Sequence, residues 1–198
     1  MNLPNLLSVA RIILVPLLVS VMLTKFEGRL VLGLPVELVA AAIFGLAAIT
    51  DWLDGYLARR RQQITALGQM LDPLADKLLI SATLISLVQL DMVSAWMVAV
   101  IIGREFVVTG LRHRAFARGT PMPASRAGKA KMISQIVAIL LLLLGGERVP
   151  LFVWLGRAAM WVVMGTALYS AFHYYREYLR LTPSGERDAV TPSRDERG

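Results

Sequence analysis

Six long apolar runs dominate this chain and limit the folds that it can adopt. Each is close to the length of about 20 residues that a helix needs to cross the hydrocarbon core of a bilayer. The candidate spans are residues 7–25, 34–58, 73–91, 94–113, 128–146 and 151–175. Of the 198 residues, 56% are hydrophobic, and a soluble domain of this length would not group them in such blocks. The runs predict an all-α membrane protein with six transmembrane helices and one domain over residues 1–181.

The two ends of the chain differ from these spans. The opening MNLPNLLSVAR lacks the basic stretch of a signal peptide. Asn5 or Ser8 is a candidate cap for a short interfacial helix before the first span. Residues 182–198, TPSGERDAVTPSRDERG, are polar and rich in turn formers, which predicts a disordered cytoplasmic tail.

Basic residues gather on one side of the spans, and this asymmetry sets the orientation. That side receives Arg59, Arg60, Arg61, Arg112, Arg114, Arg118, Arg126, Lys129, Lys131 and the tail from Arg176. The other side receives Lys25, Arg29 and Arg148, with Arg157 further into the last span. Both termini are therefore predicted to be cytoplasmic, in a cell membrane. Orientation and anionic lipid account for the net charge of +7, so we expect no nucleic-acid partner.

Four aspartates stand at the cytoplasmic ends of the second and third spans: Asp51, Asp54, Asp72 and Asp76. Spacings of three and four residues put each pair on one helix face. The short connection makes the two helices antiparallel neighbours, so the pairs are expected to converge. Four carboxylates that lie together need a counter-charge. Magnesium or manganese suits an all-oxygen cluster and favours phosphate oxygens as its remaining ligands.

Each aspartate also has an ordinary structural explanation. Asp72 before Pro73 is a good helix start, with the aspartate as N-cap. Asp51 has Arg59 and Lys77 as candidate ion-pair partners. Such explanations suit single aspartates better than four at these spacings on one membrane face. Ionisable residues within spans are functional candidates by default.

The complete pattern is Asp51-x2-Asp54-Gly55-x2-Ala58-Arg59-x8-Gly68-x3-Asp72-x3-Asp76. It resembles the signature of the CDP-alcohol phosphatidyltransferases, and all eight fixed positions are filled within 26 residues. The resemblance implies a homodimer of six-helix subunits with cytoplasmic active sites. It also implies the reaction of that family, in which the hydroxyl of an acceptor alcohol displaces CMP from a CDP-linked lipid.

The resemblance assigns roles to the residues of this pattern. Asp51, Asp54 and Asp72 would be ligands of two Mg²⁺ or Mn²⁺ ions, and Asp76 a further ligand or the general base. We favour Asp76 as base because three carboxylates suffice for metal and it lies one turn deeper. Gly55 and Ala58 would make room for the CDP moiety, at which Gly68 is also expected. Arg59 would meet a phosphate or pair with an aspartate.

Basic residues near the fourth and fifth spans bear on the acceptor. Arg104 is too deep in its span for orientation alone and requires a partner, either Glu105 or an anion. Arg104, Arg112, Lys129 and Lys131 together would suit an acceptor that carries its own phosphate. This favours glycerol 3-phosphate or an inositol phosphate over serine or free inositol.

Three further stretches narrow the resemblance: NLPNLLSVARIILVPLL, REFVVTGLR and GKAKMISQ. They resemble the subfamily that makes phosphatidylglycerophosphate from CDP-diacylglycerol and glycerol 3-phosphate. That subfamily usually has threonine after the second lysine, where this chain has Met132. The alternatives are a sister enzyme that uses inositol phosphate or phosphatidylglycerol, and a divalent-cation transporter. Transport sites lie near the midplane between repeats, whereas these acids cluster toward one face and no repeat is evident.

Overall fold

The computed structural model describes residues 3–23, 30–31, 34–61, 66–117, 126–145 and 149–181. It describes side chains within residues 9–23, 34–50, 73–117, 130–145 and 149–180. The tail predicted at 182–198 lies outside this part of the chain.

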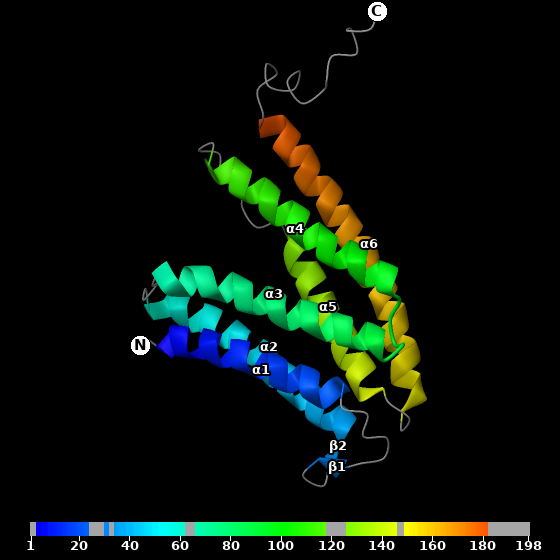
Figure 1. Cartoon of the computed structure of the whole chain (residues 1–198). Coiled ribbons are helices and arrows are strands. Elements are labelled where there is room, and N and C mark those ends of the chain that lie inside the picture. Colours follow the sequence, from blue (N-terminus) through cyan, green and yellow to red (C-terminus); the bar gives the residue numbers. More distant parts are fainter. Residues whose placement is uncertain are drawn as a thin grey trace, which may run out of the picture.

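The described residues form six long helices and one very small hairpin (Figure 1). The helices are α1 (Leu3–Leu23), α2 (Val36–Arg61), α3 (Ala66–Gln89), α4 (Ala95–Ala117), α5 (Arg126–Leu144) and α6 (Pro150–Leu181). Between α1 and α2, β1 (Leu30–Val31) pairs antiparallel with β2 (Leu34–Pro35). The predicted all-α class and the six helices are confirmed. That all six cross a bilayer stays a prediction.

One helix, α6, is long and apolar enough by length and composition to cross a membrane among the residues that the structure describes. Three other helices contain shorter apolar stretches, Val9–Leu23, Val36–Thr50 and Ala130–Leu144.

The first helix differs from the prediction. Residues 3–23 form one continuous helix, so Asn5 and Ser8 lie inside it and no separate interfacial helix precedes the span. Pro4 falls in the first turn, where its missing N–H costs no hydrogen bond. No other residue between Leu3 and Arg11 breaks a helix. The helix therefore begins at Leu3, before the apolar span predicted from residue 7.

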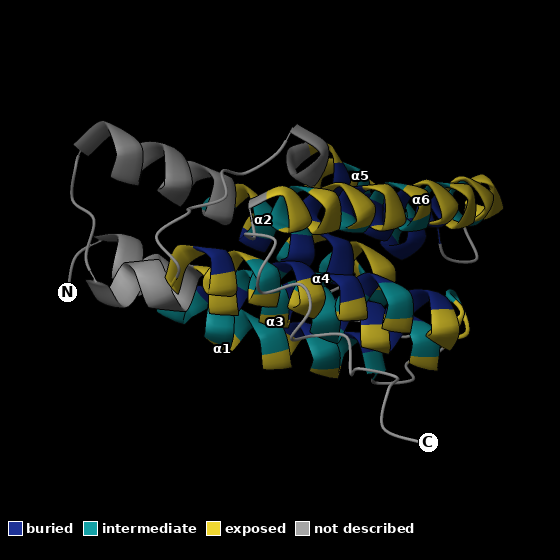
Figure 2. Cartoon of the chain, turned by 90° about the horizontal axis from the view of Figure 1, so that it is seen from above, coloured by how far each residue is buried: buried dark blue, intermediate teal, exposed yellow. Residues whose placement is uncertain are grey.

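All six helices contribute to one apolar core. α1 packs on α2 and α3, α2 packs on α5, and α6 packs on both α4 and α5. Fully buried side chains at the centre come from every helix: Leu18, Phe44, Leu84, Ile101, Leu142 and Val163. Figure 2 shows buried residues where helices face one another and exposed residues on the outer sides.

The turn between α3 and α4 closes the end of the bundle away from the aspartates. Asp91 has a φ of 55°, and the amide of Met92 donates to the carbonyl of Leu87 at 3.0 Å. This is a Schellman motif, which satisfies carbonyls at the end of α3. Arg157 of α6 donates to the carbonyls of Asp91 and Met92, both at 3.3 Å. The motif and the arginine together fix α6 against this turn.

The close contact between α5 and α6 generates a stability prediction. A Cβ on Gly156 would lie 2.7 Å from Leu142 Cγ and 3.0 Å from its backbone nitrogen, so Gly156→Ala must push the helices apart. We expect a loss of about 1–3 kcal/mol from overpacking, measured by thermal unfolding in detergent. Gly165→Ala is the matched control, because a Cβ there meets nothing within 4 Å. Equal melting temperatures for the two variants would contradict the tight contact.

Candidate active site

The four aspartates of the signature lie on either side of the connection between α2 and α3. Asp51 and Asp54 are in the last turns of α2, and Asp72 and Asp76 are in the first turns of α3. The two helices run antiparallel (Figure 1). At a rise of 1.5 Å per residue, Asp54 and Asp72 lie about 10 Å from the connected helix ends, and Asp51 and Asp76 about 15 Å. Each aspartate of α2 therefore has a counterpart on α3 at nearly the same depth.

The start of α3 removes one structural explanation for Asp72. The helix begins at Ala66 and carries Pro73 inside it, so Asp72 is not an N-cap. Pro73 leaves the carbonyl of residue 69 without its usual helical donor. An interior aspartate beside an interior proline stabilises the helix poorly, so helix stability does not explain Asp72.

Asp76 is the one signature aspartate whose side chain the structure describes, and it is half-buried. Within the described side chains, no three His, Cys, Asp or Glu residues lie together as a metal site would require. The side chains of Asp51, Asp54 and Asp72 lie outside that set. The same holds for the other signature positions, Gly55, Ala58 and Arg59 on α2 and Gly68 on α3.

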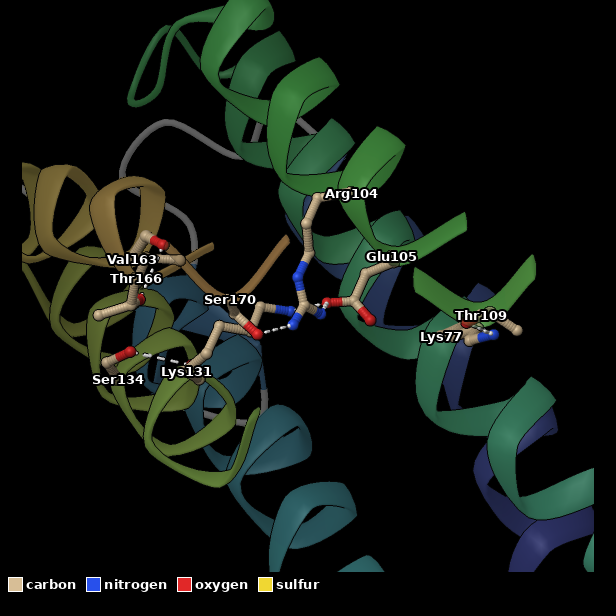
Figure 3. Close-up of polar contacts among 9 residues, drawn as sticks. All are labelled: Lys77, Arg104, Glu105, Thr109, Lys131, Ser134, Val163, Thr166 and Ser170. Carbon is tan, nitrogen blue, oxygen red and sulfur yellow. Dashed lines mark hydrogen bonds and ion pairs between the residues drawn. The ribbon is translucent and has the colours of Figure 1, made fainter. Parts of the chain in front are cut away.

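A second polar group, built from α4, α5 and α6, is described in full. Arg104 and Lys131 are buried, with 9% and 5% of their surface exposed. Arg104 Nη1 donates to Glu105 Oε1 at 2.9 Å, and Lys131 Nζ donates to the same oxygen. Arg104 Nη2 donates to Ser170 Oγ on α6. Figure 3 shows the guanidinium between Ser170 and Glu105, with Lys131 beside it. We call these four residues the cation cluster.

The cation cluster is coupled to the aspartate end of the bundle. Asp76 is close enough to Lys131 to interact with it electrostatically. The next residue on α3, Lys77, donates to Thr109 Oγ1 at 2.9 Å and joins α3 to α4 (Figure 3). A group that Lys131 binds would therefore lie near the carboxylate that we favour as general base.

Of the four basic residues predicted to meet an acceptor phosphate, the structure brings Arg104 and Lys131 together. Arg112 lies on α4 with an exposed side chain. Lys129 lies in the first turn of α5, and its side chain is outside the described set. Met132, the departure from the subfamily pattern, is 38% exposed and so points away from the buried Lys131.

Two buried donors near the cluster have no acceptor among the described residues: Arg104 Nε and Gln135 Nε2. Gln135 follows Lys131 by one turn of α5 and lies on the same face. Buried donors are nearly always paired in folded proteins. Unpaired donors beside two cations favour an anion with several oxygens, such as a phosphate.

Arg11 on α1 is a buried charge that the sequence analysis did not single out. It is 1% exposed, in a helix that packs on both aspartate-bearing helices, and it takes part in an interaction with another residue. The signal was present in the sequence, since an arginine within an apolar run is a functional candidate. Ser170 was also missed, because no pattern around it points to Arg104, which lies 66 residues away.

The donor chemistry at the aspartate end suits a hard divalent cation. Asp51, Asp54, Asp72 and Asp76 offer only carboxylate oxygens, from helices that place them at matched depths. Magnesium and manganese prefer such ligands, and magnesium usually shares them with phosphate.

Comparison with known proteins identifies the family. The family model for CDP-alcohol phosphatidyltransferase matches residues 1–169. The chain belongs to the CDP-alcohol phosphatidyltransferase family. The matched segment contains the signature aspartates, Arg104, Glu105 and Lys131, whereas Ser170 follows it directly. Membership confirms that the chain is a phosphatidyltransferase.

Relatives within the family share much of the chain. A Bacillus subtilis protein named CDP-diacylglycerol--glycerol-3-phosphate 3-phosphatidyltransferase is 46% identical over 88% of this chain and 93% of its own. A Pseudomonas fluorescens protein of the same name is 37% identical over 89% of each chain. A rice cardiolipin synthase (CMP-forming) is 33% identical over 91% of this chain and 58% of its own.

The burial of Arg11 generates a prediction for this phosphatidyltransferase. Arg11→Met should change the melting temperature in detergent, because it removes a charged side chain that is 1% exposed inside an apolar bundle and with it the interaction that Arg11 makes. Arg180→Met, the same change at an exposed position of α6, is the control. An Arg11→Met protein that melts with the wild type would show that the buried charge contributes nothing to stability.

Proposed function

We propose that this protein transfers the phosphatidyl group of CDP-diacylglycerol to glycerol 3-phosphate, which gives phosphatidylglycerophosphate and releases CMP. The observation that carries the proposal is the buried pair Arg104 and Lys131 within electrostatic range of Asp76. Two cations beside a candidate base suit an acceptor that has both a hydroxyl and a phosphate. The names of the bacterial relatives support the same reaction.

The outer surface supports a place in the cell membrane. Large apolar side chains are exposed on every helix, among them Ile13, Leu46, Ile85, Phe106, Ile133 and Trp154. A soluble monomer rarely exposes so much contiguous apolar surface, whereas lipid tails would cover it favourably. We infer six spans with both termini in the cytoplasm, from the basic residues that cluster at the aspartate end. The proposed active site then faces the cytoplasm, where glycerol 3-phosphate is available.

The proposed roles follow from position along the helices. Arg104 and Lys131 bind the acceptor's phosphate and orient one of its two hydroxyls toward Asp76. The hydroxyl oxygen forms a bond to the phosphorus of the phosphatidyl group, its proton passes to Asp76, and the bond from that phosphorus to the CMP oxygen breaks. Gly55, Ala58, Arg59 and Gly68 lie on the helices that would face the CDP moiety.

Asp51, Asp54 and Asp72 are the residues that would hold Mg²⁺ or Mn²⁺ ions, with Asp76 as a further ligand or as the general base. Such ions neutralise the diphosphate of the donor lipid when bound. The protein's own contribution is to keep these carboxylates on two packed helices at matched depths.

Phosphatidylglycerol is the second candidate acceptor, favoured by similarity to the rice cardiolipin synthase (CMP-forming). Its phosphate is a diester with one negative charge, whereas glycerol 3-phosphate carries close to two at neutral pH. The cation cluster, with two cations and one carboxylate, attracts the more highly charged acceptor more strongly.

The first test is CMP release by purified protein in detergent with CDP-diacylglycerol and magnesium. We expect turnover with glycerol 3-phosphate and little with phosphatidylglycerol or serine, because only a phosphate monoester brings the charge that the cation cluster attracts. Inositol phosphate is also a monoester, and the names of the bacterial relatives favour glycerol 3-phosphate over it. A chelator should abolish turnover, and added Mg²⁺ or Mn²⁺ should restore it. Turnover with a different acceptor would overturn the assignment of glycerol 3-phosphate, and metal movement without CMP would indicate transport.

The role of Asp76 generates a separate prediction. Asp76→Asn keeps the shape of the side chain but removes its capacity to take a proton, so turnover should fall about 10²–10⁴-fold with folding preserved. Asp91→Asn is the matched control at the far end of α3, where a φ of 55° also suits asparagine. Near-normal CMP release by Asp76→Asn would exclude Asp76 as base and as an essential metal ligand.

A further inference from the structure

One carboxylate oxygen in the bundle accepts hydrogen bonds from two buried cations on different helices. Glu105 Oε1 contacts Arg104 Nη1 on its own helix and Lys131 Nζ on α5 (Figure 3). Both helices pack on α6. Glu105 is less buried than its partners, with 27% of its side chain exposed against 7% for each cation. The carboxylate therefore lies on the more open side of the cation cluster.

We propose that Glu105 is a positioning residue for the acceptor: it holds Arg104 and Lys131 at one point, ready to bind a phosphate monoester. The proposal rests on the proposed function, since it assumes that these two cations meet the acceptor. It adds a role for Glu105, and through Arg104 for Ser170, in setting the affinity for that acceptor.

Electrostatics gives the first reason for this role. Two buried cations at contact distance from one point repel each other, and water does little to screen them there. A shared carboxylate offsets that repulsion and keeps both charged groups together. It also leaves the cluster with one net positive charge from these three side chains, which attracts a phosphate and gives a neutral alcohol no advantage.

The choice of partners available to Lys131 gives the second reason. Lys131 has two acidic neighbours, Glu105 in direct contact and Asp76 within electrostatic range. If Glu105 lost its charge, Asp76 would become the main attraction for the ammonium group. Without the shared carboxylate, nothing among the described contacts would hold Lys131 beside Arg104, and the two cations would no longer be fixed to meet the same phosphate.

The unused donors argue that Glu105 does not simply occupy the place of the phosphate. Lys131 keeps two ammonium protons beyond the one directed at Glu105. Arg104 Nε has no acceptor among the described residues. A phosphate can use these donors while Glu105 remains in contact with both cations.

Ser170 supports the same arrangement from the opposite side. Its hydroxyl is fully buried on α6 and accepts from Arg104 Nη2. The guanidinium is thus held at one end by Ser170 and at the other by Glu105. Loss of Ser170 alone leaves the shared carboxylate in place, so its effect should be smaller and in the same direction.

The test compares Glu105→Gln with wild type in the CMP-release assay, varying glycerol 3-phosphate and CDP-diacylglycerol in turn. Glutamine has nearly the same shape as glutamate but carries no charge. We expect the KM for glycerol 3-phosphate to rise about 10-fold or more, because a buried charged partner is lost. The KM for CDP-diacylglycerol and the kcat at saturating acceptor should stay near wild type, which a general defect in folding would not allow.

Two further variants sharpen the result. Ser170→Ala should raise the acceptor KM by a smaller factor. Glu37→Gln, the same change at an exposed position in the first turn of α2, should alter neither KM. If Glu105→Gln does not fold, Glu105→Asp replaces it: the charge remains, but the shorter side chain cannot reach both cations, and the acceptor KM should still rise.

Several outcomes would overturn the proposal. An acceptor KM that stays unchanged would show that Glu105 does not position the cations, and a lower one would show that it competes with the phosphate. Equal increases in both KM values would indicate a purely structural role. A wild-type protein that releases no CMP with glycerol 3-phosphate would overturn the proposed acceptor, and this inference with it.

Discussion

The cost of burying charge within an apolar helical bundle determines how this protein is built. An isolated ion loses several kcal/mol when it leaves water, so each buried charge requires a partner. Arg104 and Lys131 meet this requirement through one oxygen of Glu105 and through Ser170. Arg11, the most buried arginine among the described residues, also interacts with another residue. The charged groups therefore lie where helices meet, and the apolar side chains are left to cover the outside.

The antiparallel arrangement of α2 and α3 determines where the four signature aspartates lie along the bundle. Because α2 and α3 are antiparallel and joined by a short connection, residues equally far from that connection lie at the same depth. The four signature aspartates use this symmetry, with two on each helix. Lys131 comes to the same region from α5, through a helix that packs on α2 and α6. Among the described side chains, Asp76 of α3 and Lys131 of α5, from distant parts of the sequence, thus come within electrostatic range of each other.

The sequence predicts this arrangement only in part. Apolar runs reveal the six helices, because the length of each run can be read directly from the sequence. The spacing of the aspartates identifies the family. The boundaries were less predictable: Asp72–Pro73 is typical of a helix start, yet α3 begins at Ala66. The contacts of the cation cluster could not be predicted. Glu105 was a candidate partner for Arg104 by adjacency, but its bond to Lys131 and that of Arg104 to Ser170 depend on how α4, α5 and α6 pack.

The two faces of α5 differ in character: one is buried and carries Lys131, and the other is exposed and apolar. On the buried face, Lys131 contacts Glu105 and Gln135 is buried one turn further on, and Ala138, Ile139 and Leu142 continue that face into the apolar core. On the other face, Met132, Ile133 and Val137 are exposed. Substitution of an exposed residue changes contacts with the surroundings, whereas substitution of Lys131 changes the charge inside the bundle. Met132 belongs to the exposed face, so its departure from the subfamily pattern leaves the buried face with Lys131 intact. Acceptor choice should therefore depend on the few polar residues of the buried face, and the exposed face is free to vary as long as it stays apolar.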